Sequence, residues 1–497
     1  MRALVIICLL QPAFTGRATE HLYQAIDRLV AAKAGDQSLA EPASDAEFLR
    51  RATLDFTGRI PTAKSVQQFL ADPAKDKRAR LIDRLFADPL WAETMAERFH
   101  VMLMERRGKD EHWNSWLQTA FRKNKPWDTM VREMIAPDFK DEAKRGAGYF
   151  LTKRLEKYGQ NPTDHPGLTR DVGRMFMGVD LQCAQCHRHL SVKSYKQVDF
   201  QGLFAAYQNL KLQRANDSIK VAWVSEGLLK NELEYSSVFS ETQKSTGPRV
   251  PFGEEVVIPE FPKGEEWLEA PDRAKRFLGT PKFSPLQEIA TRMATKDNAY
   301  FTRNIANRAW FLMMGRGMSH PLDEVHGQNP PSHPKLMALM TKEFAANGFD
   351  IKWLVREIAL SASYQRSSRL PEGVKDVAAD RYRTAHPKAM TPEQILRAVL
   401  QATGNTKWVT ALKAPANAEK FNRRGYFTGT NLELPSSYEE VKALWLLTYA
   451  EPAGTAEVDF LPGLNKALFL MNDRMIQDWL KPKQGNLVER LTKLKTP

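Results

Sequence analysis

Apolar residues recur at intervals of three or four along most of this chain, which is the spacing of helices that bury one face. One such series follows Pro89, and another ends at Gly315. The same period returns in the last hundred residues. Together these series predict a mainly α fold with two helical regions. The series comprise Trp91, Met95, Phe99 and Met102; Trp113, Trp116, Leu117 and Phe121; Val198, Phe200, Leu203, Phe204 and Tyr207; Phe301, Ile305, Ala309, Trp310 and Met313; and Leu336, Leu339, Met340 and Phe344.

Polar residues at the ends of these series predict where helices start and stop. Ser44 with Glu47 three positions later is a capping box, in which each side chain bonds the other residue's backbone N–H. Gly58 and Gly315 are expected to end helices, because glycine readily adopts the left-handed conformation found there. Ser332 is expected to cap the helix that begins near Pro334.

The stretch between the two helical regions has a different pattern of apolar residues. From about residue 218 to residue 262, short apolar runs such as Val256, Val257 and Ile258 are broken by Gly and Pro. This predicts a few short strands or an extended connector. The expected organisation is therefore a helical domain over 19–210, a connector with short strands over 211–284 and a second helical domain over 285–497.

The N-terminus resembles a secretory signal peptide over residues 1–18. Met1-Arg2 is positive, Ala3 to Leu10 is apolar, and Gly16-Arg17-Ala18 offers a cleavage site of small residues. A buried first helix or a start codon placed too late are the alternatives. No other apolar run reaches the ~20 residues that span a bilayer. A periplasmic or extracellular protein without a transmembrane anchor is expected.

Composition is that of a globular protein with a basic surface. The chain has 497 residues, 42% of them hydrophobic and 26% charged, with a formal net charge of +13. Lys and Arg are spread along the sequence among Asp and Glu rather than clustered, which argues against nucleic-acid binding. The excess charge favours an acidic protein or an anionic polysaccharide as partner.

The most specific chemical signal is Cys183-Ala184-Gln185-Cys186-His187. Beyond residue 18 these two cysteines are the only ones in the chain. In c-type cytochromes such a CxxCH motif joins haem covalently through both thiols, and the histidine ligates the iron. A disulfide or thiol redox pair remains an alternative. So does a zinc site made by Cys183, Cys186, His187 and His189, with His165 able to replace one ligand.

The second axial ligand of such a haem is left open by the sequence. Met175 and Met177 lie just upstream of the motif, although both also suit a helix core. Further candidates are His100, His112 and His165. His189 is too close to His187 in the chain to reach the opposite face of a porphyrin.

No other motif of comparable specificity is present, since phosphate loops, GxSxG and HExxH are all lacking. Arg303, Asn307 and Arg308 fall near one helix face, and Asp323 is expected to pair with one of them. A buried Arg–carboxylate network is the ordinary interpretation of this group. A substrate-binding site is the alternative.

Several stretches resemble two domains of secreted planctomycete proteins. Arg51 to Asp55, with Thr57-Gly58 and Pro61-Thr62, and Leu181 to His189 resemble the planctomycete cytochrome-like domain. Arg303-Asn304 with Asn307 to Trp310, Gly315 to Gly317, Asn329 to Pro334, Ser363 to Gln365 and Ala467 to Asn472 resemble the planctomycete-specific domain that usually follows it.

This resemblance covers roughly residues 20 to 480 and implies export, a covalent haem and an association with bacteria that degrade complex polysaccharides. It supplies no reaction, so no catalytic residue is predicted. One departure concerns the motif itself. Relatives commonly continue as His-Asp-His-Pro-Phe, whereas this chain has His187-Arg188-His189-Leu190-Ser191.

Two hypotheses of different class follow from the sequence. In the first, the chain is an exported monohaem c-type protein that transfers electrons or supports a redox reaction linked to polysaccharide degradation. In the second, it is a non-redox binding or scaffold protein whose motif holds zinc or a disulfide.

Overall fold

The fold is known from a computed structural model that describes residues 20–217, 219–240, 242–272, 274, 277–413, 421–429, 433–457 and 463–494. The predicted signal segment and its cleavage site therefore lie outside the described residues.

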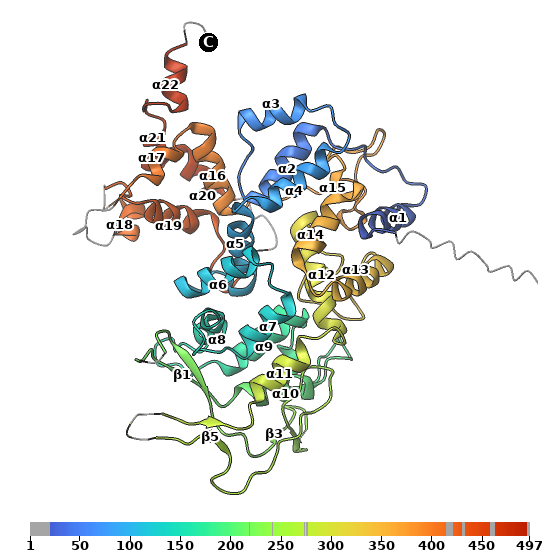
Figure 1. The fold of residues 1–497 in the computed structure, drawn as a ribbon, viewed down its shortest axis with the longest axis vertical. Helices are drawn as coiled ribbons and strands as arrows, with labels where there is room; N and C mark the ends of the chain where they lie inside the picture. The colour runs from blue at the N-terminus through green and yellow to red at the C-terminus, as the bar shows by residue number, and fades with distance from the viewer. Residues whose placement is uncertain are drawn as a thin grey trace, which may run out of the picture.

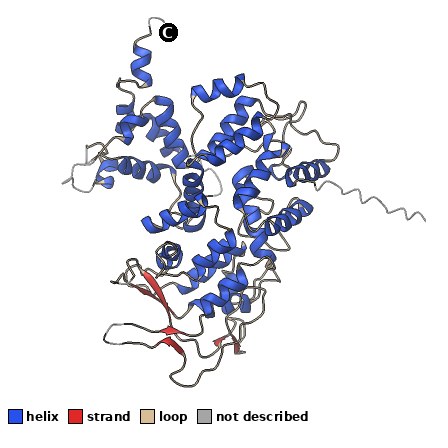
Figure 2. Cartoon of the chain, viewed as in Figure 1, coloured by secondary structure: helices blue, strands red, loops and turns tan. Residues whose placement is uncertain are grey.

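The prediction of a mainly α fold with a short strand-bearing part is confirmed (Figures 1 and 2). The first helical region contains α1 (Leu22–Ala34), α2 (Asp45–Thr57), α3 (Ala63–Ala71), α4 (Lys77–Ala87), α5 (Leu90–Met104), α6 (Glu111–Arg122), α7 (Trp127–Ile135), α8 (Tyr149–Arg154), α9 (His165–Val172) and α10 (Gln197–Tyr207). Shorter helical turns in this region are η1 (Arg145–Gly148), the π-helix η2 (Gly173–Met177) and η3 (Cys183–Gln185). A further short turn, η4 (Ala379–Arg381), lies in the second helical region.

The second helical region follows the strands. It contains α11 (Pro285–Met293), α12 (Ala299–Met314), α13 (Pro334–Ala346), α14 (Ile351–Leu360), α15 (Ala362–Gln365), α16 (Pro392–Thr403), α17 (Thr406–Thr410), α18 (Arg423–Thr428), α19 (Tyr438–Tyr449), α20 (Leu464–Asn472), α21 (Arg474–Trp479) and α22 (Leu487–Thr492).

The described strands form separate two-stranded antiparallel ladders at one end of the molecule (Figure 2). They are β1 (Leu210–Gln213) with β2 (Trp223–Glu226), β3 (Leu233–Tyr235) with β4 (Lys244–Thr246), and β5 (Trp267–Glu269) with β6 (Thr280–Pro281). In the first ladder Leu210 lies opposite Glu226. The apolar run Val256–Ile258 forms no strand. Val256 is buried, whereas Val257 is 85% exposed, so this run lies at the surface.

Local capping chemistry places α2 as expected, with one difference. The Ser44 hydroxyl accepts a hydrogen bond from the Glu47 backbone N–H at 3.2 Å, and Gly58 ends the helix with a φ of 64°. The Glu47 carboxylate does not return to Ser44. It accepts hydrogen bonds from the Ser368 backbone N–H at 2.9 Å and from Arg51 at 2.6 Å. A partner distant in sequence thus replaces half of the predicted capping box.

The expected cap at Ser332 is wrong. Helix α13 begins at Pro334, and the preceding residue, His333, occupies the N-cap position without a side-chain cap. Because the N-cap residue directly precedes the first helical residue, Ser332 lies one position too early. Its hydroxyl instead lies 3.1 Å from the His333 Nδ1 atom.

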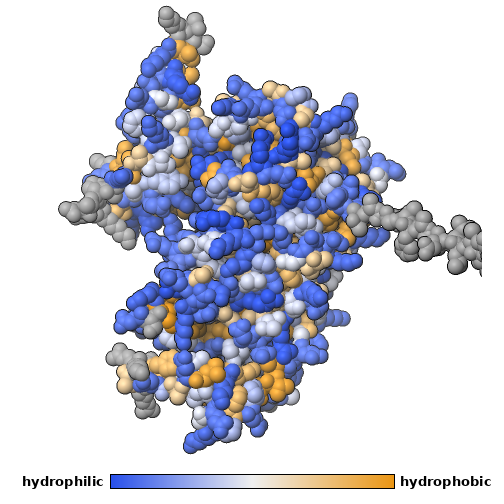
Figure 3. Space-filling view, in the orientation of Figure 1, coloured by the Kyte–Doolittle hydropathy of each residue, from blue (hydrophilic) through white to orange (hydrophobic). Residues whose placement is uncertain are grey.

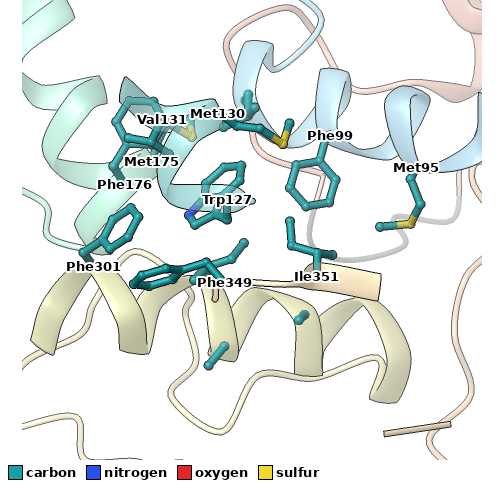
Figure 4. Close-up of a cluster of buried hydrophobic side chains, with 14 of the residues drawn as sticks. Met95, Phe99, Trp127, Met130, Val131, Met175, Phe176, Phe301, Phe349 and Ile351 are labelled. Atoms are coloured by element: carbon teal, nitrogen blue, oxygen red, sulfur yellow. The ribbon is translucent and has the colours of Figure 1, made fainter. Parts of the chain in front are cut away.

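One continuous hydrophobic core unites the two helical regions. Helix α1 packs against α13 and α14, and α7 packs against α11. Figure 4 shows the centre of this core, where Trp127 lies among side chains from both regions, including Phe99, Phe176 and Phe349. The Trp127 ring is 5.5 Å from that of Phe99 and 6.3 Å from that of Phe176. The regions are therefore not independent packing units.

A second, smaller core lies toward the C-terminus. Helices α16, α17, α19, α20 and α21 contribute its apolar side chains, with Trp445 fully buried at its centre. The face in Figure 3 is mostly hydrophilic, with scattered apolar residues. Among the described residues, no helix combines the length and apolarity that crossing a bilayer requires.

Replacement of Trp127 by alanine should destabilise both helical regions together. Removing a buried tryptophan leaves a cavity and typically costs about 3–5 kcal/mol. Urea denaturation should report this loss, and hydrogen exchange should show lower protection in both α7 and α12. Trp445→Ala, in the second core, should leave protection in α7 and α12 unchanged. Loss of protection in α7 alone would show that the two regions unfold separately.

Candidate functional site

The CxxCH motif forms a single tight turn on the surface. The backbone N–H groups of Cys186 and His187 both lie 3.4 Å from the carbonyl oxygen of Cys183. Ala184 is fully buried and anchors the turn, and η3 packs against α10. Both cysteines are exposed and neither is in a disulfide. Both thiols of the motif are thus accessible to solvent.

The imidazole of His187 has a defined orientation. Its Nδ1 atom lies 2.6 Å from the carbonyl oxygen of Arg188. Since a carbonyl can only accept, Nδ1 must carry the proton, and the lone pair of a neutral ring is then on Nε2. A backbone carbonyl on Nδ1 is the usual support for a histidine that ligates a metal through Nε2.

Apolar side chains border the motif although they are exposed. Leu190, Val238 and Phe239 are 73%, 67% and 72% exposed. The backbone N–H of Val238 donates to the carbonyl of Cys186 at 3.1 Å, and the Phe239 ring lies 4.9 Å from that of His187. We call these three residues the motif-flanking apolar patch.

His189 is held in a way that opposes metal binding. Its Nδ1 atom accepts hydrogen bonds from the backbone N–H groups of Ser191 and Val192, at 3.2 and 2.9 Å. A neutral ring then carries its proton on Nε2, so neither nitrogen offers a free lone pair. The ring packs edge-on against Tyr195, and His326 packs against the same tyrosine.

The other candidate ligands have different surroundings. Met175 and Met177, in η2, are both buried in the main core. The Nε2 atom of His165 lies 2.9 Å from the carbonyl oxygen of Leu210. His100 Nδ1 accepts from the Trp113 indole at 3.0 Å, and burial lowers the pKa of His100 to about 4. His112 is exposed at the start of α6.

The described residues do not bring together enough metal-ligating side chains for a site made by protein alone. In the part of the chain that the structure describes, no group of three or more His, Cys, Asp or Glu side chains could hold a metal ion. The hydrogen bonds of His189 occupy one of the four ligands of the zinc alternative. Cys183, Cys186 and His187 are the residues that would hold a group bringing its own metal, since both thiols are exposed and a neutral His187 ring has its lone pair on Nε2.

A buried ion network lies directly upstream of the motif. The Arg174 guanidinium contacts Glu105 at 2.5 and 3.0 Å, Asp171 at 2.8 Å and Asp323 at 3.1 Å. Asp323 also pairs with Arg308, as the sequence predicted. Burial alone would lower the pKa of Arg174, but the hydrogen bond with Glu105 and the charges of the three carboxylates raise it.

The other two residues predicted near Asp323 have separate roles. The Arg303 guanidinium lies 5.1 Å over the Tyr300 ring, and the Asn307 amide donates to the carbonyl of Ser319 at 2.7 Å. Glu105, Asp171 and Arg174 were not predicted, because nothing in their local sequence distinguishes them from surface charges.

Glu105 is held in an unusual backbone conformation. It ends α5 with a φ of 45°, the left-handed region that non-glycine residues rarely adopt, and its side chain is 1% exposed. Such a residue costs on the order of 1–3 kcal/mol unless its surroundings hold it. Here Arg107, at 2.6 Å, and Arg174 bind the carboxylate and offset that cost.

The same network fixes the chain that leads into the motif. The Asn304 amide donates to the carbonyl of Met175 at 2.7 Å, and the Val325 backbone N–H donates to the carbonyl of Gly178 at 2.9 Å. Gly178 has a φ of 68°, and an added Cβ would lie 2.8 Å from a Val325 methyl. The second helical region therefore positions the backbone just before Cys183.

Two family models match the chain in sequence order. The first is PSCyt2, described as a protein of unknown function (DUF1549), which matches residues 25–212. The second is PSD1, described as a protein of unknown function (DUF1553), which matches residues 287–494. No curated protein and no solved structure matches the chain. The CxxCH turn lies in the first match, whereas Arg308 and Asp323 lie in the second.

The ion network should make stability depend on acid pH. Burial by itself raises the pKa of Asp171, but Arg154, Arg174 and Arg107 outweigh it and lower the pKa to about 2. An ordinary Asp has a pKa of about 3.9, so ionised Asp171 contributes about 2–3 kcal/mol of stability. This contribution is present at pH 7 and is lost as the pH falls from about 4 to about 2.

The test compares wild type with Asp171→Asn by urea denaturation at pH 7, 4 and 2.5. The variant should be less stable at pH 7 and should lose less stability on acidification, because its amide cannot titrate. Equal acid sensitivity in both proteins would contradict the assigned role of Asp171.

Proposed function

This chain belongs to the family that joins a PSCyt2 domain to a PSD1 domain, and on that premise we propose that it is an exported c-type cytochrome-like protein. In this proposal Cys183 and Cys186 bind one haem covalently and His187 is its axial ligand. The protein would transfer electrons or support a redox reaction linked to polysaccharide degradation.

The orientation of His187 carries the proposal. Covalent attachment needs two accessible thiols, and both cysteines are exposed and free. Axial ligation needs an imidazole nitrogen with a free lone pair, and in a neutral ring the bond from Nδ1 to the Arg188 carbonyl assigns that lone pair to Nε2. A bound haem would supply a one-electron carrier.

The motif-flanking apolar patch supports the same assignment. Porphyrin rings are large and apolar, and covering exposed apolar side chains is favourable by roughly 25 cal/mol per Å². Val238 and Phe239 contact Cys186 and His187, and Leu190 follows His187 by three positions, so a ring attached to the motif would find exposed apolar side chains beside it. The second axial ligand stays open, because Met175 and Met177 are buried in the main core.

The net positive charge of the chain favours a partner with a negatively charged surface. A net charge of +13 would steer the protein toward acidic surfaces. We therefore propose an acidic redox partner or an anionic polysaccharide as the molecule it meets outside the cytoplasm.

Covalent haem can be tested on protein exported in cells that mature c-type cytochromes. Wild type should retain haem staining after denaturing electrophoresis, because thioether bonds survive unfolding. The double variant Cys183→Ser, Cys186→Ser should lose the stain. His187→Ala should keep it, since both thiols remain, but should show an altered absorption spectrum.

Metal analysis of the same samples separates the alternatives. One iron per chain agrees with the proposal. Colourless, iron-free wild type would overturn it, and one zinc per chain in that sample would favour the non-redox scaffold. A disulfide in colourless protein would show as a loss of free thiols that reductant restores.

The motif-flanking apolar patch should affect the midpoint potential of a bound haem. Phe239→Ser would expose the group to water, which favours the more charged oxidised state, so the midpoint potential should become more negative. Haem staining should persist, because the thiols are unchanged. Leu268→Ser, at another exposed leucine on β5, should leave the potential unchanged in a spectroelectrochemical titration. Equal potentials in wild type and Phe239→Ser would remove the patch from the site.

A further inference from the structure

A cavity of about 380 Å³ lies between the two family domains, and its lining includes neither Cys183 nor Cys186. Its apolar wall comes from α5, α12 and the start of α16. Val101, Met102, Phe311, Leu312 and Ile395 line it and are each only half-buried, since part of each side chain faces the cavity. Ligand sites for small molecules combine such a wall with a few well-placed polar groups.

Most charges around this cavity already have partners. Glu97 pairs with Arg397 at 2.5 Å, and Glu105 and Asp323 both pair with Arg174. The carboxylates lining the cavity also include Glu393, which Arg106 contacts at 2.8 Å. Guanidinium groups offset the charge of these four carboxylates.

Arg98 is the exception. Its side chain is 11% exposed and lines the cavity, and its Nη2 atom lies a marginal 3.5 Å from Asp55 Oδ1. Across the described ranges, the structure gives this guanidinium no other polar partner. Asp55 is already bound by Lys388 and by the Tyr364 hydroxyl. The remaining N–H groups of the Arg98 guanidinium are therefore available to donate hydrogen bonds to a bound acceptor.

The helix brings the charge and the apolar wall together. Arg98 precedes Val101 by three positions and Met102 by four, so all three side chains lie on one face of α5. A planar guanidinium matches carboxylate and sulfonate oxygens in geometry and charge. An anion bound there would have apolar groups directly beside it.

From this arrangement we propose that the cavity binds a small organic anion with an apolar body. The anionic group contacts Arg98, and the body packs against Val101, Met102, Phe311 and Leu312. This site is separate from the proposed haem site and does not depend on it.

Two matched dyes test the proposal on the full-length protein. 8-Anilinonaphthalene-1-sulfonate has an aromatic body and a sulfonate, and N-phenyl-1-naphthylamine has the same body without the charge. Fluorescence titration of wild type should show saturable binding that favours the sulfonate. Arg98→Gln should weaken sulfonate binding about tenfold, as expected when a charge-assisted hydrogen bond is lost, and should abolish the preference.

Three controls locate the binding. Met102→Trp, which fills the cavity, should reduce binding of both dyes. Arg84→Gln, at an exposed arginine on α4, and Phe239→Ser, in the motif-flanking patch, should bind like wild type. Thermal unfolding confirms that each variant is folded, and Lys388 still pairs Asp55 when Arg98 is replaced.

The proposal is overturned if wild type shows no saturable binding, if Arg98→Gln keeps the wild-type preference, or if Phe239→Ser removes the binding. Each of these results is independent of haem content, which is measured separately by staining.

Discussion

The buried carboxylate of Glu105 is the charge on which the arrangement of this protein depends. Removing such a group from water costs several kcal/mol, and only closely placed counter-charges offset that cost. Arg174 and Arg107 provide them, and Arg174 also binds Asp171 and Asp323. The end of α5, the turn η2 and the segment after α12 must therefore stay together. Because Asp323 lies in the second family domain and Glu105 in the first, the two domains share an ionic centre as well as a hydrophobic core.

The ion network around Glu105 and Arg174 also fixes the position of the CxxCH motif. Arg174 lies in η2, a few residues before Cys183, and Asn304 and Val325 hold the backbone between them. The turn itself is exposed, so its thiols are accessible while its base is fixed from inside the molecule. In the proposed function, this base would hold an attached group in a fixed position. The coupling also gives a physical reason for the two domains to occur in one chain.

Local signals in the sequence predicted local structure well. The start of α2 at Ser44, the end of α12 at Gly315 and the tight CxxCH turn each depend on neighbouring residues. Contacts between residues far apart in the sequence could not be predicted. The Glu47 carboxylate binds Ser368 instead of completing the capping box, and Glu105 pairs with Arg174 across 69 residues without a sequence pattern. The pairing of Arg308 with Asp323 was predictable, because only 15 residues separate them.

The π-helix η2 connects the two proposed sites. Within its five residues, Arg174 enters the ion network while Met175 lines the cavity, and the backbone carbonyl of Met175 is bound by Asn304. Such π-turns recur at functional sites, because the extra residue re-aims the side chains around it. A change at Arg174 or Met175 would therefore disturb both the cavity and the backbone leading to the motif. Arg98 lines the cavity, whereas the Phe239 ring packs against His187 of the motif. The cavity and the motif can thus be examined separately, although one short turn supports both.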